Sequence, residues 1–176
     1  MVVNLKEEIK NSDINLIIGS KSNYIENINF ILKEINFISN KIGYITLNKP
    51  YTKILSDIQK LNLDKNKFFF VDAITATVSS PPIVDNCVFV SSPSALTEIS
   101  VSFSTLVQEK NADLIFFDTI STLIIYQDIG QVIKFAHNII TKARVLGKKA
   151  IFLTLKEDSE TLIKDLNMFV DKIIEL

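Results

Sequence analysis

The sequence predicts an α/β protein with a doubly wound, mainly parallel sheet and helices on both faces. Short apolar runs alternate with segments of helical period along all 176 residues. The runs show little polar alternation, as in residues 68–72 (FFFVD), which is typical of strands covered on both sides. Helix-length connections between such strands imply right-handed crossovers. We therefore expect one α/β domain over residues 1–176.

In the first half of the chain, three apolar runs predict strands and two amphipathic segments predict helices. The expected strands are residues 14–19, 43–47 and 68–72. The expected helices are residues 22–39, with Ile25, Ile28, Leu32 and Ile35 on one stripe, and residues 51–61, with Ile54, Leu55 and Ile58 inward.

The alternation breaks at residues 73–94, which contain SSPP, the short strand candidate CVFVSS and Pro93. Proline and serine clusters of this kind mark turns and loops. We expect a loop or a hairpin-like insertion here.

The second half resumes the alternation. Ser94 is the expected N-cap of a helix over residues 95–109. Gly147 is the expected C′ residue that closes a helix over residues 128–146. The remaining expected elements are strands at residues 114–118 and 150–155, a helix at 160–166 and an edge strand within 170–176.

Composition excludes several kinds of site. The net charge is −1 and Arg144 is the only arginine, which argues against a nucleic-acid surface. Cys87 and His137 are each the sole residue of their type, which argues against a disulfide, a zinc site or a Ser-His-Asp triad. No signal peptide and no apolar run of about 20 residues is present, so we expect a cytoplasmic protein without a membrane span.

Ligands of open parallel sheets bind at the carboxyl ends of the strands. The candidate segments are therefore residues 19–23, 48–50, 72–75, 118–122 and 154–158. Asp72 and Asp118 each end a strand, which raises the hypothesis of an acid–base pair.

The segment DLIFFDTISTLIIY, residues 113–126, resembles the Walker B strand and following turn of the RecA/KaiC-like P-loop ATPases. Residues 92–107 and 132–155 are also similar to the KaiC-like branch, in particular to its small archaeal members. The resemblance implies a RecA-like three-layer sandwich in which Asp118 orients a magnesium ion. It also implies that the strand ending in Asp118 lies beside the strand ending in Gly19, and that subunits assemble into rings with nucleotide between them.

The sequence departs from that family where phosphate would bind. The motif G-x-x-x-x-G-K-[ST], begun at Gly19, places Tyr24 at the second glycine, Ile25 at the lysine and Glu26 at the Ser/Thr. The catalytic glutamate that the family has after its second strand is replaced here by Asn48-Lys49-Pro50. Arg144, within a predicted helix, matches no trans-acting basic position.

Two local features each allow two interpretations. Lys21, with Ser20 and Ser22, could contact a phosphate, or residues 20–23 could be a solvated turn capped by Ser22 or Asn23. Asp118 could hold a metal ion, or it could cap its own turn by accepting the amides of Ile120 or Ser121.

The favoured hypothesis is a catalytically inactive RecA/KaiC-like domain, without catalytic residues or cofactor, that acts as a regulatory or scaffolding protein. Its partner would be a protein, either a second copy or an active relative. The alternative is a weak nucleotide-binding protein without efficient hydrolysis. ATP and Mg²⁺ would then bind at Gly19, Ser20, Lys21, Ser22, Asn23 and Asp118. An unrelated α/β enzyme is disfavoured by the shortage of His, Cys and Arg.

Overall fold

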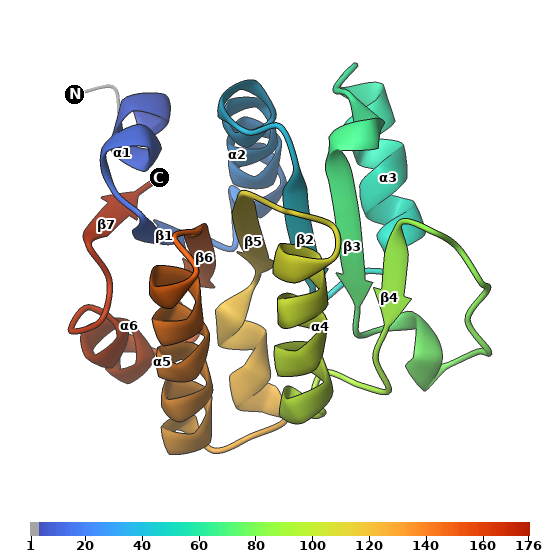
Figure 1. Ribbon diagram of the computed structural model, residues 1–176. Helices are drawn as coiled ribbons and strands as arrows, with labels where there is room; N and C mark the ends of the chain where they lie inside the picture. Colours follow the sequence, from blue (N-terminus) through green and yellow to red (C-terminus); the bar gives the residue numbers. More distant parts are fainter. Residues whose placement is uncertain (1–3) are drawn as a thin grey trace.

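Seven parallel strands form one sheet in the order β4-β3-β2-β5-β6-β1-β7. The protein is described by a computed structural model that covers residues 4–176 (Figure 1). The strands are β1 (Ile14–Gly19), β2 (Ile42–Thr46), β3 (Phe68–Asp72), β4 (Cys87–Phe89), β5 (Leu114–Asp118), β6 (Lys149–Leu155) and β7 (Lys172–Glu175). The predicted fold class is therefore confirmed, and the sheet is entirely parallel.

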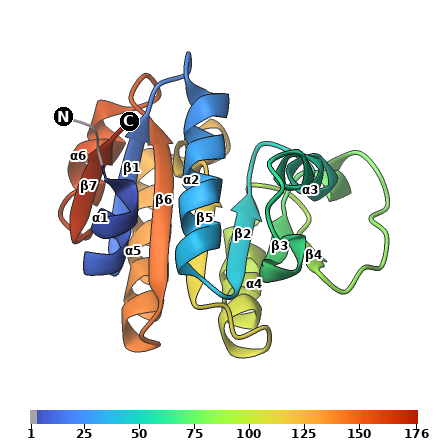
Figure 2. The ribbon, with the colours of Figure 1, turned by 90° about the horizontal axis from the view of Figure 1, so that it is seen from above.

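Helices cover both faces of the sheet (Figures 1 and 2). One face packs against α1 (Leu5–Asn11), α2 (Tyr24–Ile38) and α3 (Tyr51–Lys60). The other packs against α4 (Leu96–Gln108), α5 (Ile129–Val145) and α6 (Glu160–Leu166). Short 3-10 helices are η1 (Lys65–Lys67), η2 (Thr75–Thr77) and η3 (Ile120–Ile125). No helix within residues 4–176 is both long and apolar enough to cross a bilayer.

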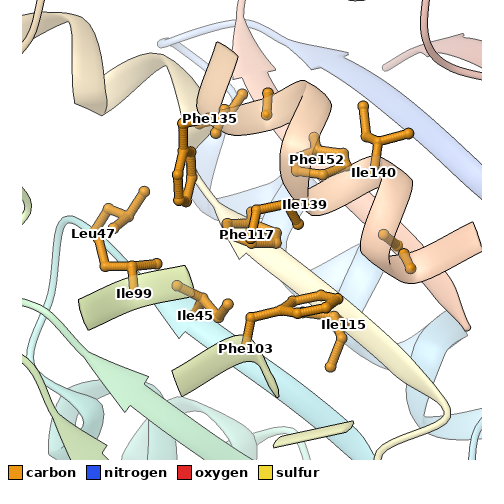
Figure 3. Close-up of a cluster of buried hydrophobic side chains, with 14 of the residues drawn as sticks. Ile45, Leu47, Ile99, Phe103, Ile115, Phe117, Phe135, Ile139, Ile140 and Phe152 are labelled. Atoms are coloured by element: carbon orange, nitrogen blue, oxygen red, sulfur yellow. The ribbon is translucent and has the colours of Figure 1, made fainter. Parts of the chain in front are cut away.

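Each face of the sheet has its own aromatic core. Under α4 and α5, the rings of Phe117 and Phe152 stack with centroids 4.8 Å apart, and Phe135 meets Phe117 edge-on (Figure 3). Under α2 and α3, the ring of Tyr44 meets Phe116 edge-on at 5.1 Å. Strand residues alternate between these two cores because successive side chains point to opposite faces.

Gly43 lets α4 approach β2 closely. A Cβ atom at this position would lie 2.5 Å from Cδ1 of Ile115 and 2.8 Å from Cδ1 of Leu106, and both side chains are buried. The absence of a side chain at Gly43 therefore makes room for these two core residues.

Helix ends follow the sequence signals in part. Asp128 accepts the amide of Gln131 at 3.0 Å and caps α5, and Gly147 follows that helix with φ of +62°, as predicted. The expected capping by Ser94 is wrong. Ala95 is the N-cap of α4, and its methyl group can make no side-chain cap bond. The Ser94 hydroxyl pairs with that of Ser92 at 2.6 Å.

Residues 73–94 contain η2, an exposed loop and the edge strand β4. After η2 the chain projects beyond β3 and α3, then returns as the edge strand β4 (Figures 1 and 2). β4 pairs with β3 in parallel, with Phe70 opposite Cys87, so the segment is no hairpin. Val78 and Ile83 on this loop are fully or almost fully exposed.

Candidate functional site

The carboxyl ends of β1, β2, β5 and β6 bring four of the five candidate segments together. The turn after β1, residues 20–23, contacts the turn after β6 through Lys21 and Asp158. The turn after β2 contacts the turn after β5 through Asn48 and Thr119. Helix α2 connects the two halves, because Tyr24 at its start reaches Asp118. These contacts define a polar cluster at one edge of the sheet.

The backbone amides of the turn after β1 are hydrogen-bonded within the protein. The amide of Asn23 donates to the carbonyl of Ser20 at 3.3 Å, and that of Tyr24 donates to the carbonyl of Lys21 at 3.4 Å. The amide of Lys21 donates to Glu157 Oε2 at 3.1 Å. Asn23 is the N-cap residue of α2, but its side chain makes no cap bond. Three of the amides in this turn are therefore already paired with oxygen atoms of the protein.

Lys21 points to the turn after β6. Its Nζ atom lies 2.7 Å from Asp158 Oδ1, although 58% of its side chain is exposed. The hydrogen bond and the negative charge of Asp158 raise the pKa of Lys21. Asp158 also accepts the hydroxyl of Ser121 at 2.7 Å, and that hydroxyl accepts the amide of Leu155 at 3.3 Å. The ammonium group and the amide of Lys21 thus both contact carboxylates.

Asp118 is fully buried, and two tyrosines donate to it. The hydroxyl of Tyr24 lies 2.6 Å from Oδ1, and the hydroxyl of Tyr44 lies 2.5 Å from Oδ2. Tyr44 reaches the carboxylate from the neighbouring strand β2, whereas Tyr24 comes from the start of α2. Each carboxylate oxygen therefore has a hydroxyl donor.

Burial and hydrogen bonding act in opposite directions on Asp118. Burial raises its pKa because the charged form loses hydration, whereas the hydroxyls of Tyr24 and Tyr44 and the charge of Lys49 lower it. The balance is a pKa above that of an ordinary aspartate. Burial, together with the nearby Asp118 charge, raises the pKa of both tyrosines, so that they stay neutral donors at physiological pH.

Lys49 and Asn48, in the turn after β2, complete the polar cluster near Tyr24. The Nζ atom of Lys49 lies 4.6 Å from the centroid of the Tyr24 ring, within the range of a cation–π interaction. Asn48 donates to Thr119 at 3.2 Å and accepts the hydroxyl of Thr122 at 2.5 Å. These contacts hold the turn after β2 against the turn after β5.

Three expectations about Asp118 are wrong. Its strand does not lie beside β1, because β6 is between them. It does not cap its turn through the amides of Ile120 or Ser121, since its oxygens accept the tyrosine hydroxyls. It does not pair with Asp72, because β2 separates their strands and Asp72 accepts the amides of Tyr51, Ile74 and Thr75 and the hydroxyl of Thr75.

The isolated polar residues have structural contacts. Arg144 pairs with Asp171 at 2.5 Å near the end of α5, and the ring of His137 packs on Phe169 with centroids 4.6 Å apart. Cys87 is buried at the sheet edge. Within residues 4–176, no three His, Cys, Asp or Glu side chains gather into a group that could hold a metal ion. The assignments of residues 19–23 to nucleotide and of Asp118 to metal stay predictions.

Sequence reasoning missed three residues of the cluster. From the sequence alone, Tyr24 is only a poor substitute for glycine, Tyr44 is one residue of a buried strand, and Glu157 is part of a turn. The one signal available was position, since Tyr24 and Glu157 follow strands that end at the same edge of the sheet. That signal does not say which side chain meets which.

No protein-family model matches the sequence, and no curated protein is significantly similar to it. Solved structures do show a similar fold. One is a KaiC-like protein, PH0186, from the hyperthermophilic archaeon Pyrococcus horikoshii OT3, with a TM-score of 0.66 and 14% identity over 93% of this chain and 70% of that one. Another is the flagellar accessory protein FlaH from Methanocaldococcus jannaschii, with a TM-score of 0.56 and 14% identity over 98% of this chain and 76% of that one. At this level of identity the similarity concerns the fold, and the chain has a RecA-like α/β fold.

Proposed function

We propose that this protein is a catalytically inactive RecA/KaiC-like domain that acts as a regulatory or scaffolding protein through protein–protein contacts. The observation that carries the proposal is the engagement of both Asp118 oxygens by the hydroxyls of Tyr24 and Tyr44. Mg²⁺ requires oxygen ligands in octahedral geometry and usually shares them with nucleotide phosphates. A magnesium ion at Asp118 would have to share a fully buried carboxylate with two tyrosine hydroxyls.

The turn after β1 supports the same proposal. A phosphate-binding loop offers free backbone amides to phosphate oxygens. Here the amides of Lys21, Asn23 and Tyr24 are paired within the protein. Glu157 and Asp158 place two carboxylates against Lys21, and these would repel a triphosphate. ATP and Mg²⁺ therefore fit these residues poorly.

One observation favours the alternative, weak nucleotide binding. Lys21 lies in the turn two residues before the N-cap of α2, near a helix end whose dipole favours an anion, and its ion pair with Asp158 is partly exposed. Exposed ion pairs contribute little to stability. Lys21 could therefore leave Asp158 for a phosphate at small cost.

Thermal unfolding with and without ATP and Mg²⁺ distinguishes the inactive domain from a nucleotide-binding protein. A ligand at about 100 times its Kd stabilises a protein by about 2.7 kcal/mol, and a domain of this size gains about 2–4 °C per kcal/mol. Tight binding would thus raise the Tm by roughly 5–11 °C. The inactive domain is expected to shift by less than about 1 °C at ~5 mM ATP, which places any Kd at or above the millimolar range.

A clear rise in Tm that Asp118→Ala abolishes would overturn the proposal in favour of nucleotide binding. Phosphate release above that of a Lys21→Ala variant would overturn both the inactive domain and weak nucleotide binding without hydrolysis. The protein-contact role has its own measurement, which is sedimentation equilibrium over a range of concentrations. A mass that rises with concentration supports self-contact, and a constant monomer mass argues against it.

A further inference from the structure

A groove runs between α4 and α5 on the face opposite α2. The two helices lie side by side on this face (Figure 1). A hollow of about 510 Å³ lies between Leu96, Ser100 and Val101 of α4 and Lys134, Phe135 and Asn138 of α5. The site at the carboxyl edge of the sheet involves none of these residues.

The groove continues to the far end of both helices. A second hollow, of about 240 Å³, is lined by Ser104 and Gln108 of α4 and by Val145 and Leu146 at the end of α5. Lys142 lines both hollows. The two hollows therefore follow nearly the whole of α4, whose 13 residues span roughly 20 Å at 1.5 Å per residue. That length suits three to four turns of another helix.

The walls of the groove carry apolar side chains exposed to solvent. Val101 is 62% exposed and Val145 is 79% exposed, while Phe135 forms a buried floor at 7%. The two exposed valines lie along the groove, Val101 at the first hollow and Val145 at the second. An apolar stripe laid along this groove would remove both valines from water.

The charged side chains that line the groove are all positive. Its lining includes Lys134 and Lys142 and no carboxylate. Neither lysine forms an ion pair with any residue in the described part of the chain, 4–176. Lys142 instead donates to Ser100 Oγ at 2.8 Å across the groove. The groove is therefore complementary to acidic side chains.

We propose that the α4–α5 groove docks an amphipathic helix of a partner protein, with an apolar stripe against Val101 and Val145 and acidic residues along the edges facing Lys134 and Lys142. Helix-in-groove recognition uses apolar anchors at i, i+3 or i+4, and i+7. A second copy of this chain is a poorer occupant. On α2, which has exposed apolar side chains, the ammonium of Lys6 lies 3.6 Å from the centroid of the Phe37 ring, so that surface presents a lysine to the lysines of the groove.

A displayed library of helices tests the proposal. Each helix has roughly 13 residues, the length of α4, with Leu fixed at i, i+3 and i+7 and random flanking positions. Selection against the full chain is expected to enrich Asp and Glu at the flanks. Binding of an enriched peptide is then measured by fluorescence anisotropy at low salt.

Three variants check the position of the peptide. Lys134→Glu is expected to weaken binding by about three- to tenfold, because it replaces attraction by repulsion at an exposed contact. Val101→Asp is expected to weaken it by at least about tenfold, since a carboxylate would face the apolar stripe. Lys33→Glu, the same charge change on an exposed lysine of α2, is the matched control and should leave binding unchanged. Urea midpoints confirm that all three fold.

Flanks without enrichment of Asp and Glu, or equal effects of Lys134→Glu and Lys33→Glu, would overturn the proposal. So would a Val101→Asp variant that converts a self-associating protein to a monomer, because the occupant would then be a second copy. The inference rests on the proposed role in protein contacts. A nucleotide-induced rise in Tm would contradict the inactive domain without touching the groove, so the two can fail separately.

Discussion

Replacing Tyr24 by Phe removes one hydroxyl from Asp118 and leaves the ring in place. The carboxylate is fully buried, and the lost bond is 2.6 Å long. After the change, Oδ1 has no tyrosine donor and only Tyr44 still donates to Oδ2. This substitution therefore isolates the hydrogen bond on which the proposed function depends.

The expected loss follows from the charge of the acceptor. A hydrogen bond to a charged group contributes about 1.5–3 kcal/mol, compared with about 1 kcal/mol between neutral groups. We expect Tyr24→Phe to lower the free energy of unfolding by about 2 kcal/mol at pH 8. In a domain of this size that loss corresponds to a fall in Tm of roughly 4–8 °C.

The loss should depend on pH in a defined direction. Burial raises the folded-state pKa of Asp118 above its unfolded value of about 3.9, so the folded protein binds this proton more tightly. The stability from this proton is present in full below the unfolded pKa and is lost as pH rises through the folded pKa. The Tyr24 hydroxyl lowers that pKa, so its removal costs most where Asp118 is charged. The difference between variant and wild type should therefore be smaller at about pH 4.5 than at pH 8, because less of Asp118 is charged at the lower pH.

Urea unfolding followed by circular dichroism at both pH values measures the effect. Tyr126→Phe is the matched control, because Tyr126 is 46% exposed and its hydroxyl makes no hydrogen bond to residues 4–176. The control should change the free energy of unfolding by less than about 0.5 kcal/mol. A Tyr24→Phe variant as stable as the control at pH 8, or a loss equal at both pH values, would refute the reasoning.

Three further substitutions test the surrounding structure by urea unfolding. Asp72→Ala should lose more than about 3 kcal/mol, because it leaves three buried or half-buried amides and the Thr75 hydroxyl without their acceptor, and a smaller loss would contradict that account. Gly43→Ala should lose about 1–3 kcal/mol by crowding Ile115, whereas a neutral result would mean that the core relaxes freely. Lys21→Ala should leave the urea midpoint unchanged, since its ion pair is partly exposed, and a large fall would show that this pair holds the turn.

Elements governed by local sequence were predictable. The apolar runs ending at Gly19, Asp72 and Asp118 are strands that end at those residues, and the parallel class followed from the helix-length segments between them. Gly147 was predictable as a helix terminator because its positive φ is a local requirement. Ser94 was mispredicted because hydroxyls compete for partners within a serine-rich turn, and Ser92 is the partner.

The contacts of the candidate site were not predictable, because they join residues far apart in the chain. Tyr24 and Tyr44 are 94 and 74 positions from Asp118. Whether they meet depends on the strand order, and the resemblance placed β5 beside β1 when β6 separates them. Helical period and strand alternation say which face a residue takes, but not which distant residue shares that face.

The pairing of β2 with both of its neighbours has a consequence for folding. Thr46 lies opposite Asp72 on one side and opposite Asp118 on the other. If β3 or β5 slipped by one residue against β2, its aspartate would turn towards the core on the opposite face. Asp118 would then lose both tyrosine hydroxyls, and Asp72 would lose the amide of Tyr51. The two buried carboxylates therefore help to fix the register of β3 and β5 against β2. A misregistered sheet would bury a carboxylate with fewer hydrogen-bond donors, which costs more than the displacement of an apolar side chain.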